Sequence, residues 1–229
     1  QQIDHLLEIG PGKGAMTSLL LEKCESLTAI EIDKDLIRFL KKAYGDRKNF
    51  NLIEKDILLY DPKELVRVNK LIGNIPYNIS TPIIEWIIDN KSSFDEIFLM
   101  LQKEFGERCV AQPNTKSYGR LSIFVQCFFD VTVIREVDKS SFDPSPNVQS
   151  IFLKLIPKVS DMTPNSILMK NLSTLTREAF SKRRKLITNS LKSFFTEEDL
   201  VNLGIERKSR PENLSVETYI KLAKSIQSG

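Results

Sequence analysis

The chain has 229 residues, of which 41% are hydrophobic and 28% charged, with a net charge of +3. This length fits one large domain, or a medium domain with a small appendage, and the 13 Phe residues argue for a packed core. No run approaches about 18 uncharged apolar residues, so no membrane span is predicted. The N-terminus has neither an initiator Met nor a signal-peptide stretch, and we expect the sequence to start inside a longer protein. Three scattered cysteines without metal-ligand spacing indicate reduced thiols in a cytoplasmic protein.

Up to Pro157 the chain alternates short apolar runs with helical patterns. Strands are predicted over His5–Gly10, Ser26–Ile32, Phe50–Glu54, Leu71–Gly73, Phe94–Leu101, Val131–Val137 and Ser150–Ile156. Helices are predicted over Ala15–Cys24, Lys34–Tyr44 and Thr81–Ile88. Strands that alternate with helices form βαβ units, so we expect an α/β fold with a Rossmann-like parallel sheet covered on both faces. The last two strands have no helix between them and are expected to form an antiparallel pair at one edge.

A different pattern follows Pro157, where no further strand is predicted. Thr163-Pro164 is typical of a helix start, and apolar residues then recur at helical spacing in three segments. Their members are Leu168, Leu172, Leu175 and Ala179, then Leu186, Ile187, Leu191 and Phe194, then Tyr219, Leu222, Ala223 and Ile226. Residues 196–199 are expected to cap a short helix over Leu200–Leu203. We therefore expect two domains, residues 1–157 and a small all-helical domain over residues 158–229.

A glycine-rich segment, Leu7-Glu8-Ile9-Gly10-Pro11-Gly12-Lys13-Gly14, leaves the first predicted strand and opens a helix. Glycines at such a turn let the backbone approach a ligand without a Cβ in the way. Glu31 ends the second strand, where a carboxylate can hold both hydroxyls of a ribose. Asp56 follows the third strand and can accept a hydrogen bond from an adenine amino group. The pattern therefore favours a nucleoside ligand.

Two nucleoside ligands compete for this segment. A dinucleotide-binding loop reads G-x-G-x-x-G, whereas this loop reads G-P-G-K-G, and Glu8 places negative charge near any pyrophosphate. A cationic sulfonium nucleoside suits that carboxylate better. We therefore expect S-adenosylmethionine as the cofactor and no metal.

Asn74-Ile75-Pro76-Tyr77 follows the fourth strand, at the carboxyl edge where open α/β sheets bind ligands. The lone pair of an adenine amino group is delocalised into the ring and is a poor nucleophile. An Asn oxygen and a neighbouring backbone carbonyl can accept both N–H bonds and direct the lone pair at a methyl group. Tyr77 can stack on the base. The segment therefore predicts methylation of an exocyclic amine.

Phe142 is a second aromatic candidate for holding the base. It lies between the two edge strands in a loop stiffened by Pro144 and Pro146, where it can clamp the other face of a flipped base. Its alternative role is to anchor a hairpin in the core. His5, the only histidine, and Trp86 are expected to be structural.

Basic residues gather in the predicted helical domain. Between Lys170 and Lys192, seven Lys or Arg residues accompany a single acid, Glu178. Such a block either follows RNA phosphates or forms a solvated helix face. We predict that the RNA-facing residues are Lys116, Arg120, Arg183, Arg184 and Lys185.

Taken together, these motifs resemble the rRNA adenine N6-dimethyltransferases, in particular the KsgA type. The resemblance rests on residues 7–12, 31–33, 73–80 and 142–146, and extends to residues 102–108, 118–122, 178–185, 203–205 and 210–215. It covers essentially the whole chain. The family also has a basic N-terminal segment with a Gln-aromatic-Leu element that closes over the cofactor, and this chain is expected to begin after it.

The resemblance implies a reaction and a set of residue roles. It implies methyl transfer from S-adenosylmethionine to N6 of two adjacent adenosines in the 3′-terminal hairpin loop of 16S (small-subunit) rRNA. The substrate would be an immature ribosomal subunit, and the enzyme would be a monomer. Cofactor contacts are implied for Gly10, Glu31, Asp56 and Asn74, beside Glu8, Gly12, Ile32 and Ile57. The target adenine would be held by Asn74, Ile75, Pro76, Tyr77 and Phe142.

Three alternatives stay open. Relatives that methylate large-subunit rRNA and confer macrolide resistance share the catalytic domain, although residues 183–185 and 210–215 look unlike theirs. A protein-glutamine methyltransferase usually has a second proline after the Asn, where this chain has Ile75. A ribosome-assembly factor would keep the fold and lose the reaction, and the intact motif residues disfavour it.

Overall fold

The computed structural model describes residues 4–65, 68–141, 147–159, 163, 166–181 and 185–226. The chain divides into two compact units, residues 1–106 with 131–157 and residues 107–130 with 158–229. The sequence-based division assigned residues 107–130 to the first domain. In the structure they belong to the helical unit, because the helix that they form packs on later helices of that unit.

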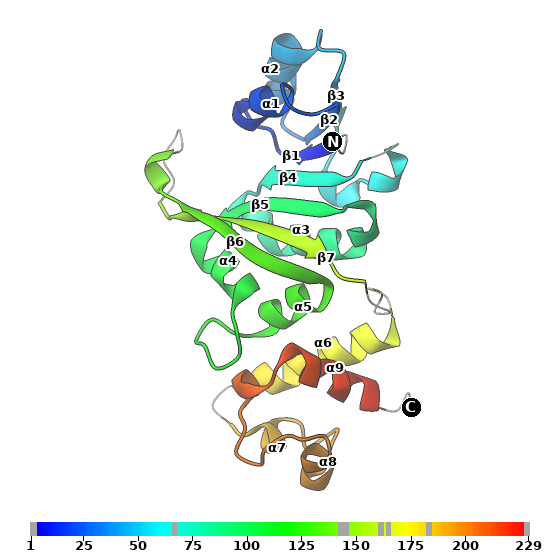
Figure 1. Cartoon of the computed structure of the whole chain (residues 1–229), viewed down its shortest axis with the longest axis vertical. Coiled ribbons are helices and arrows are strands. Elements are labelled where there is room, and N and C mark those ends of the chain that lie inside the picture. The colour runs from blue at the N-terminus through cyan, green and yellow to red at the C-terminus, as the bar shows by residue number, and fades with distance from the viewer. Residues whose placement is uncertain are drawn as a thin grey trace. The chain divides into compact units, whose positions relative to one another are not determined.

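The first unit is built on a sheet whose described strands follow the order β3-β2-β1-β4-β5-β7-β6 (Figure 1). The strands are β1 (His5–Ile9), β2 (Ser26–Glu31), β3 (Phe50–Glu54), β4 (Lys70–Asn74), β5 (Glu96–Gln102), β6 (Phe129–Val137) and β7 (Ser150–Pro157). β1 lies between β2 and β4 and pairs in parallel with both. β5 pairs antiparallel with β7, and β6 lies beyond β7 at the edge. The predicted α/β sheet with an antiparallel edge is confirmed.

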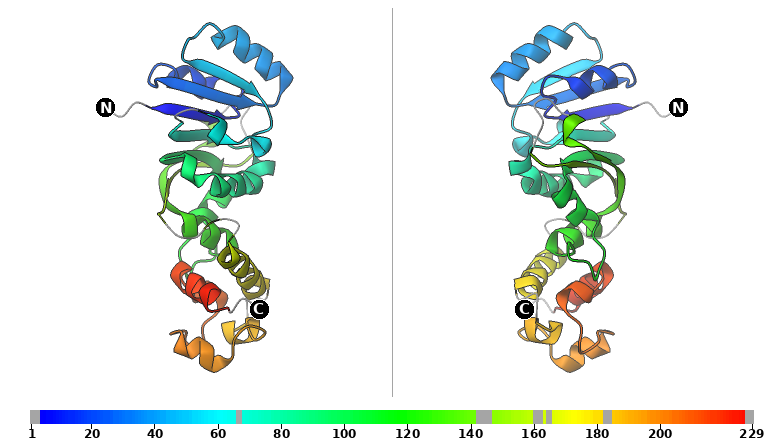
Figure 2. Two further views of the ribbon diagram at one scale, coloured as in Figure 1. Left: turned by 90° about the vertical axis from the view of Figure 1, so that its right-hand side faces the viewer. Right: turned by 90° about the vertical axis from the view of Figure 1, so that its left-hand side faces the viewer.

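Helices cover this sheet. They are α1 (Ala15–Leu20), α2 (Lys34–Tyr44) and α3 (Ser80–Asp89), with short 3-10 turns η1 (Ile57–Leu59), η2 (Pro62–Glu64), η3 (Tyr77–Ile79), η4 (Lys91–Ser93) and η5 (Lys139–Ser141). α2 packs on β2 and β3 at one end of the sheet (Figure 2). Its buried side chains are Ile37 and Leu40, and Asp33 caps its N-terminus by accepting from two backbone amides. α2 has the predicted bounds.

Two features of this unit differ from the sequence-based prediction. α1 ends at Leu20 rather than at Cys24, because the chain turns there and the Asn49 side-chain amide donates to the Leu21 carbonyl across 3.0 Å. The sequence spacing places Ala43 on one apolar face of α2 with Leu36, Ile37 and Leu40, but in the structure Ala43 is exposed. The stripe that α2 buries is therefore shorter than its periodicity suggested.

His5 and Trp86 are structural residues, as predicted. Trp86 is 7% exposed in α3, and its ring nitrogen donates to the Tyr60 carbonyl at 2.9 Å. His5 Nδ1 lies 2.8 Å from the Ser26 hydroxyl, so the imidazole links the starts of β1 and β2. Each ring thus joins two segments of the first unit.

The second unit is helical in its described residues. Its helices are α5 (Arg120–Phe128), α6 (Ile167–Ser181), α7 (Ile187–Ser190), α8 (Glu197–Asn202) and α9 (Val216–Ser225), with one 3-10 turn, η6 (Pro211–Asn213). α6 and α9 lie side by side (Figure 1). The side chains that they bury include Leu172, Leu175, Tyr219 and Leu222. The helical character predicted for the end of the chain is confirmed.

Several details of this unit correct the sequence-based expectations. α8 begins at Glu197, not at Leu200, because Thr196 and Asp199 form a capping box whose side chains bond each other's backbone amides. Phe195 is more buried than Phe194, and Ile226 lies just past the end of α9. α5, together with α4 (Lys103–Val110) before it, fills a stretch where no element was predicted. Pro164 lies outside the described residues.

Candidate active site at the carboxyl ends of the parallel strands

The glycine-rich loop between β1 and α1 is open to a ligand at two of its three glycines. Gly10, Gly12 and Gly14 all have left-handed backbones, with φ of 61°, 60° and 79°. A Cβ added to Gly10 or Gly12 would meet nothing within 4 Å, whereas one on Gly14 would lie 2.7 Å from the Tyr44 ring. Gly14 is therefore required by packing against α2, while Gly10 and Gly12 leave backbone accessible to a bound molecule.

Glu31 is held at the same loop by three backbone amides. Its carboxylate accepts from the amides of Ile32 at 2.9 Å and Asp33 at 3.0 Å, and from the amide of Gly12 at 3.4 Å. The residue is 7% exposed. These bonds fix the carboxylate at the end of β2 and leave lone pairs for further donors, such as the two hydroxyls of a ribose.

Glu8 lies beneath the loop as a fully buried acid. Thr17 on α1 donates its hydroxyl hydrogen to Oε2 of Glu8 at 2.7 Å, and Oε1 has no hydrogen-bond partner among the described residues. Burial raises the pKa of Glu8 to about 7, against the lowering effect of the Thr17 hydrogen bond. A cationic group near the loop would favour the ionised form of this carboxyl.

Asp56 and its neighbours form the end of β3. Asp56 caps η1 by accepting from the Leu58 amide at 3.0 Å, and its side chain is half-buried. Ile57, beside it, is 5% exposed, whereas Ile32 at the end of β2 is 65% exposed. Ile32 therefore offers far more apolar surface to a ligand than Ile57 does.

Asn74 is the last residue of β4, and its side chain is exposed. The following residue, Ile75, donates its amide to the Met100 carbonyl of β5 at 3.0 Å and buries its side chain, which is 1% exposed. Ile75 can therefore contribute only its backbone to a site. Pro76 is exposed, and its carbonyl accepts from the Ile79 amide at 3.2 Å as the chain enters η3.

Two predicted base-holding aromatics cannot be placed against Asn74. The side chain of Tyr77, in η3, and the whole of Phe142 lie outside the described residues. Their roles stay predictions.

The strand register brings three of the predicted residues together. Ile9 of β1 is opposite Ile30 of β2 and Gly73 of β4. One residue further along, Gly10 therefore lies between Glu31 and Asn74, and its amide donates to the Ile30 carbonyl at 3.0 Å. A glycine, a carboxylate and a carboxamide thus meet where neighbouring parallel strands end.

This arrangement fits S-adenosylmethionine better than a dinucleotide. The open backbone at Gly10 and Gly12 can be approached closely, Glu31 can accept from ribose hydroxyls, and exposed Ile32 can pack on a base. The acids at this edge, Glu8 and Glu31, would repel a pyrophosphate. The fit thus rests on the acidic and apolar character of the loop.

Three of the five predicted RNA-facing residues lie among the described residues. Lys116, Arg120 and Lys185 are exposed, and the Arg120 guanidinium lies 6.0 Å from the centre of the Phe124 ring. Arg183 and Arg184 lie outside the described residues. The sequence reading missed Thr17 and Tyr44, whose polar or aromatic character within amphipathic helices gave no signal of a role at the loop.

The described residues offer neither a metal site nor a membrane-spanning helix. Within the described ranges, no three His, Cys, Asp or Glu side chains gather in a way that could hold a metal ion. In the same ranges, no helix has the length and apolar character needed to cross a membrane.

Comparison with known proteins identifies the family. A family model described as ribosomal RNA adenine dimethylase matches residues 1–228. The chain belongs to this family. Ribosomal RNA small subunit methyltransferase A of Coxiella burnetii (strain CbuG_Q212) is 38% identical over 226 residues, which cover 97% of this chain and 87% of the relative. The resemblance inferred from the motifs is confirmed.

Solved structures agree with membership of the ribosomal RNA adenine dimethylase family. A dimethyladenosine transferase from Plasmodium falciparum is 30% identical with a TM-score of 0.79, over 96% of this chain and 90% of that one. The 23S rRNA methyltransferase ErmE is 21% identical with a TM-score of 0.73, over 99% of this chain and 92% of that one. At that identity ErmE shows a shared fold only. The chain is an rRNA adenine dimethylase by family and a class I methyltransferase by fold.

Proposed function

We propose that this chain transfers methyl groups from S-adenosylmethionine to N6 of two adjacent adenosines in the 3′-terminal hairpin loop of 16S rRNA. The observation that carries the proposal is the meeting of Gly10, Glu31 and Asn74 at one edge of the sheet. Membership of the ribosomal RNA adenine dimethylase family supports the reaction. The name of the Coxiella relative, a small-subunit enzyme, supports the substrate.

In this proposal the cofactor is held by the loop and the ends of β2 and β3. Gly10 and Gly12 give close backbone approach, Glu31 accepts from the ribose, and Asp56 accepts from the adenine amino group. Ile32 and Ile57 border the base, and Glu8 balances the positive charge from below. When bound, S-adenosylmethionine supplies an electrophilic methyl group.

The target amine is prepared by the Asn74 segment. The Asn74 side-chain oxygen and the backbone carbonyl of Ile75 or Pro76 accept both amino hydrogens of the adenine, so its nitrogen becomes more tetrahedral and its lone pair is directed outward. Tyr77 and Phe142 stack on the two faces of the base. No strong general base is required, because the amine proton becomes acidic after methylation.

The helical unit is proposed to bind the RNA, and the sheet unit to carry the reaction. Lys116, Arg120 and Lys185 are exposed cations suited to phosphate contact, with Arg183 and Arg184 as further predicted members of this set. The substrate in this proposal is the rRNA of an immature small subunit, bound by one copy of the chain.

Methylation of large-subunit rRNA is the second candidate. Its support is the shared fold with ErmE. The 38% identity with a small-subunit enzyme, against 21% with ErmE, favours the small-subunit substrate.

Methyl transfer from labelled S-adenosylmethionine tests the proposal. Immature small subunits and naked large-subunit rRNA are offered in parallel to the wild-type chain, to Asn74→Ala and to Asn51→Ala, an exposed asparagine on β3 that serves as the control. We expect dimethyladenosine in the small subunit with wild type and Asn51→Ala, and its loss in Asn74→Ala. Label in large-subunit rRNA alone would establish the second candidate. Tight subunit binding without label would establish an assembly factor.

A further inference from the structure

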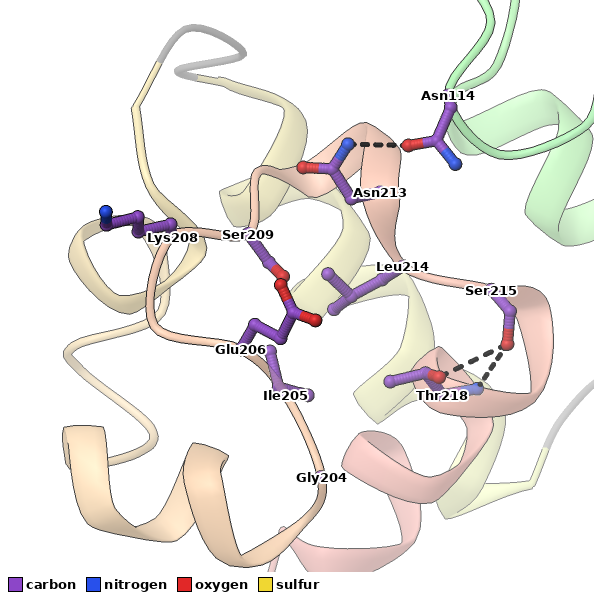
Figure 3. A pocket seen from close by; sticks show the side chains of 10 residues that line it. All are labelled: Asn114, Gly204, Ile205, Glu206, Lys208, Ser209, Asn213, Leu214, Ser215 and Thr218. Atoms are coloured by element: carbon purple, nitrogen blue, oxygen red, sulfur yellow. Dashed lines mark hydrogen bonds between the residues drawn. The ribbon is translucent and has the colours of Figure 1, made fainter.

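The helical unit contains a polar hollow at a distance in sequence from the methylation motifs. Its volume is about 540 Å³, and Figure 3 shows the side chains around it. The lining residues used below are Asn114, Glu206, Lys208, Ser209, Leu214 and Ser215. They come from the loop before α5, the loop after α8 and the start of α9, all within the second unit.

Two buried tyrosines hold the segment that contains the lining residue Leu214. The Tyr118 hydroxyl donates to the Leu214 carbonyl at 2.9 Å, and the Tyr219 hydroxyl donates to the Pro211 carbonyl at 2.9 Å. Both rings are fully buried, and Phe180 packs against each of them. The carbonyl of the lining residue Leu214 and that of nearby Pro211 are therefore fixed by the core, so this side of the hollow is preformed.

Hydrogen bonds between distant segments close its upper wall. The Asn213 side-chain amide donates to Asn114 Oδ1 at 2.7 Å (Figure 3), and the Asn114 backbone amide donates to the Glu212 carbonyl at 2.8 Å. Asn114 adopts a left-handed backbone, with φ of 70°. Asparagine tolerates this conformation, which turns its carboxamide toward the rim of the hollow.

The hollow is lined by one carboxylate, that of the exposed residue Glu206, and cations lie near it along the same loop. Figure 3 shows Glu206 and Leu214 directed toward one another across the hollow, while Lys208 points outward from the loop. Arg210 is exposed two residues further on, and the Ser209 carbonyl accepts from the Ile187 amide at 2.8 Å, which brings exposed Lys185 to the same segment. Arg207, in contrast, pairs with Glu197 at 3.1 Å.

This charge pattern fits a ligand that has uncharged N–H hydrogen-bond donors at one end and an anionic group at the other. The Glu206 carboxylate would repel a phosphate inside the hollow, so a phosphate is favoured only at the edge, beside Lys208 and Arg210. The Glu206 carboxylate needs N–H donors, whereas Leu214, which is 4% exposed, leaves almost no apolar surface to a ligand. Guanine has two neighbouring N–H donors on its Watson–Crick edge, which match the two oxygens of a carboxylate.

We propose that this hollow binds one unpaired guanine nucleotide of the RNA substrate, with the base edge on Glu206 and the phosphate against Lys208 and Arg210. This inference rests on the proposed function, because it takes the ligand to be part of the RNA that is methylated. It adds a base-reading contact to a unit whose other predicted RNA contacts are phosphate contacts.

Nucleotide titration tests the site directly. Guanosine 5′-monophosphate and uridine 5′-monophosphate are added to ¹⁵N-labelled chain, and amide signals are followed. We expect guanosine monophosphate to move the signals of Asn114, Glu206 and Ser215 and to bind at least about fivefold more tightly than uridine monophosphate. Glu206→Gln should weaken guanosine monophosphate about tenfold and remove the preference. Lys208→Ala should weaken both nucleotides alike.

Matched controls and an RNA assay separate the outcomes. Glu198→Gln and Lys224→Ala change exposed charges of the same unit away from the hollow and should leave nucleotide binding unchanged. In methylation assays, Glu206→Gln should raise KM for RNA several-fold and leave kcat unchanged. Equal binding of guanosine monophosphate by wild type and Glu206→Gln, or an unchanged KM for RNA, would overturn the guanine site and leave the proposed function intact. Absence of methylation by the wild-type chain would instead overturn the proposed function.

Discussion

The hydroxyl of Thr17 donates a 2.7 Å hydrogen bond to the buried carboxyl of Glu8, beneath the glycine loop. This single bond partly offsets the cost of burying the acid, but the pKa of Glu8 still rises to about 7. The carboxyl therefore changes its charge near neutral pH in the folded chain, while in the unfolded chain it ionises near its ordinary pKa of 4.5.

Glu8→Gln should change how stability depends on pH. Because the folded-state pKa of Glu8 lies above the unfolded value, the folded state binds the proton more tightly, and wild-type stability is lost as pH rises from about 4.5 through about 7. The glutamine variant lacks this loss, which is up to about 3 kcal/mol. Urea unfolding at pH 5 and pH 8 measures it as the difference between variant and wild type. Parallel pH profiles for the two proteins would contradict the buried, protonated carboxyl.

Replacing each of the three loop glycines by alanine should distinguish the glycines that bind the cofactor from the one that is needed for packing. All three positions have left-handed backbones, so each substitution costs about 1 kcal/mol or more of stability. Gly14→Ala should cost more, because its Cβ would meet the Tyr44 ring at 2.7 Å. Gly10→Ala and Gly12→Ala should mainly lower affinity for S-adenosylmethionine, since their Cβ atoms enter open space. Calorimetric titration and thermal unfolding of the same samples measure both effects. A loss of cofactor affinity confined to Gly14→Ala would reverse our assignment.

Tyr118→Phe should destabilise the helical unit by about 1–3 kcal/mol, because it leaves the buried Leu214 carbonyl without its hydroxyl donor. The ring is kept, so its edge contact with Phe180 remains. Denaturant unfolding gives the free-energy change. Tyr44→Phe is the comparison. The Tyr44 hydroxyl donates to the Gly14 carbonyl at 3.2 Å in a less buried position, so its removal should lower the free energy of unfolding by less. Equal costs for both would mean that burial does not set the value of the Tyr118 bond.

The double variant Arg120→Ala/Lys185→Ala should bind RNA more weakly and with a flatter salt dependence. Each lost phosphate contact lowers the slope of log K against log[salt] by about 0.7 to 0.9. The slope should therefore fall by about 1.4 to 1.8, while Lys224→Ala should leave it unchanged. Filter binding at several salt concentrations provides the slopes. If the double variant kept the wild-type slope, these two cations would not contact phosphate.

Local patterns predicted much of the site, because its parts are encoded close together in the chain. The glycine loop follows β1 directly, and Glu31 ends the next strand, so strand prediction alone places both at one sheet edge. The parallel order of β1, β2 and β4 then brings Asn74 beside them. These relations follow from strand periodicity and the handedness of βαβ units.

Contacts between distant segments were beyond sequence reasoning. Tyr118 bonds Leu214 across 96 residues of chain, and this contact helps to place residues 107–130 in the helical unit. The end of α1 depends on Asn49, which lies 28 residues after Leu21. Neither partner carries a local signal, because an asparagine or a tyrosine side chain shows its bonding partner only after the fold brings the two together.

The amide of Ile75 bonds to the Met100 carbonyl at 3.0 Å, one residue beyond Asn74. Hydrogen bonds in the middle of a sheet exchange with solvent only when a large cooperative part of the protein opens. Asn74 therefore sits on a rigid anchor, whereas substrate-binding residues on loops commonly move separately from the core. Target specificity at this edge is consequently tied to the integrity of the sheet: a substitution that loosens β5 would misplace Asn74 even without touching the cofactor or the RNA.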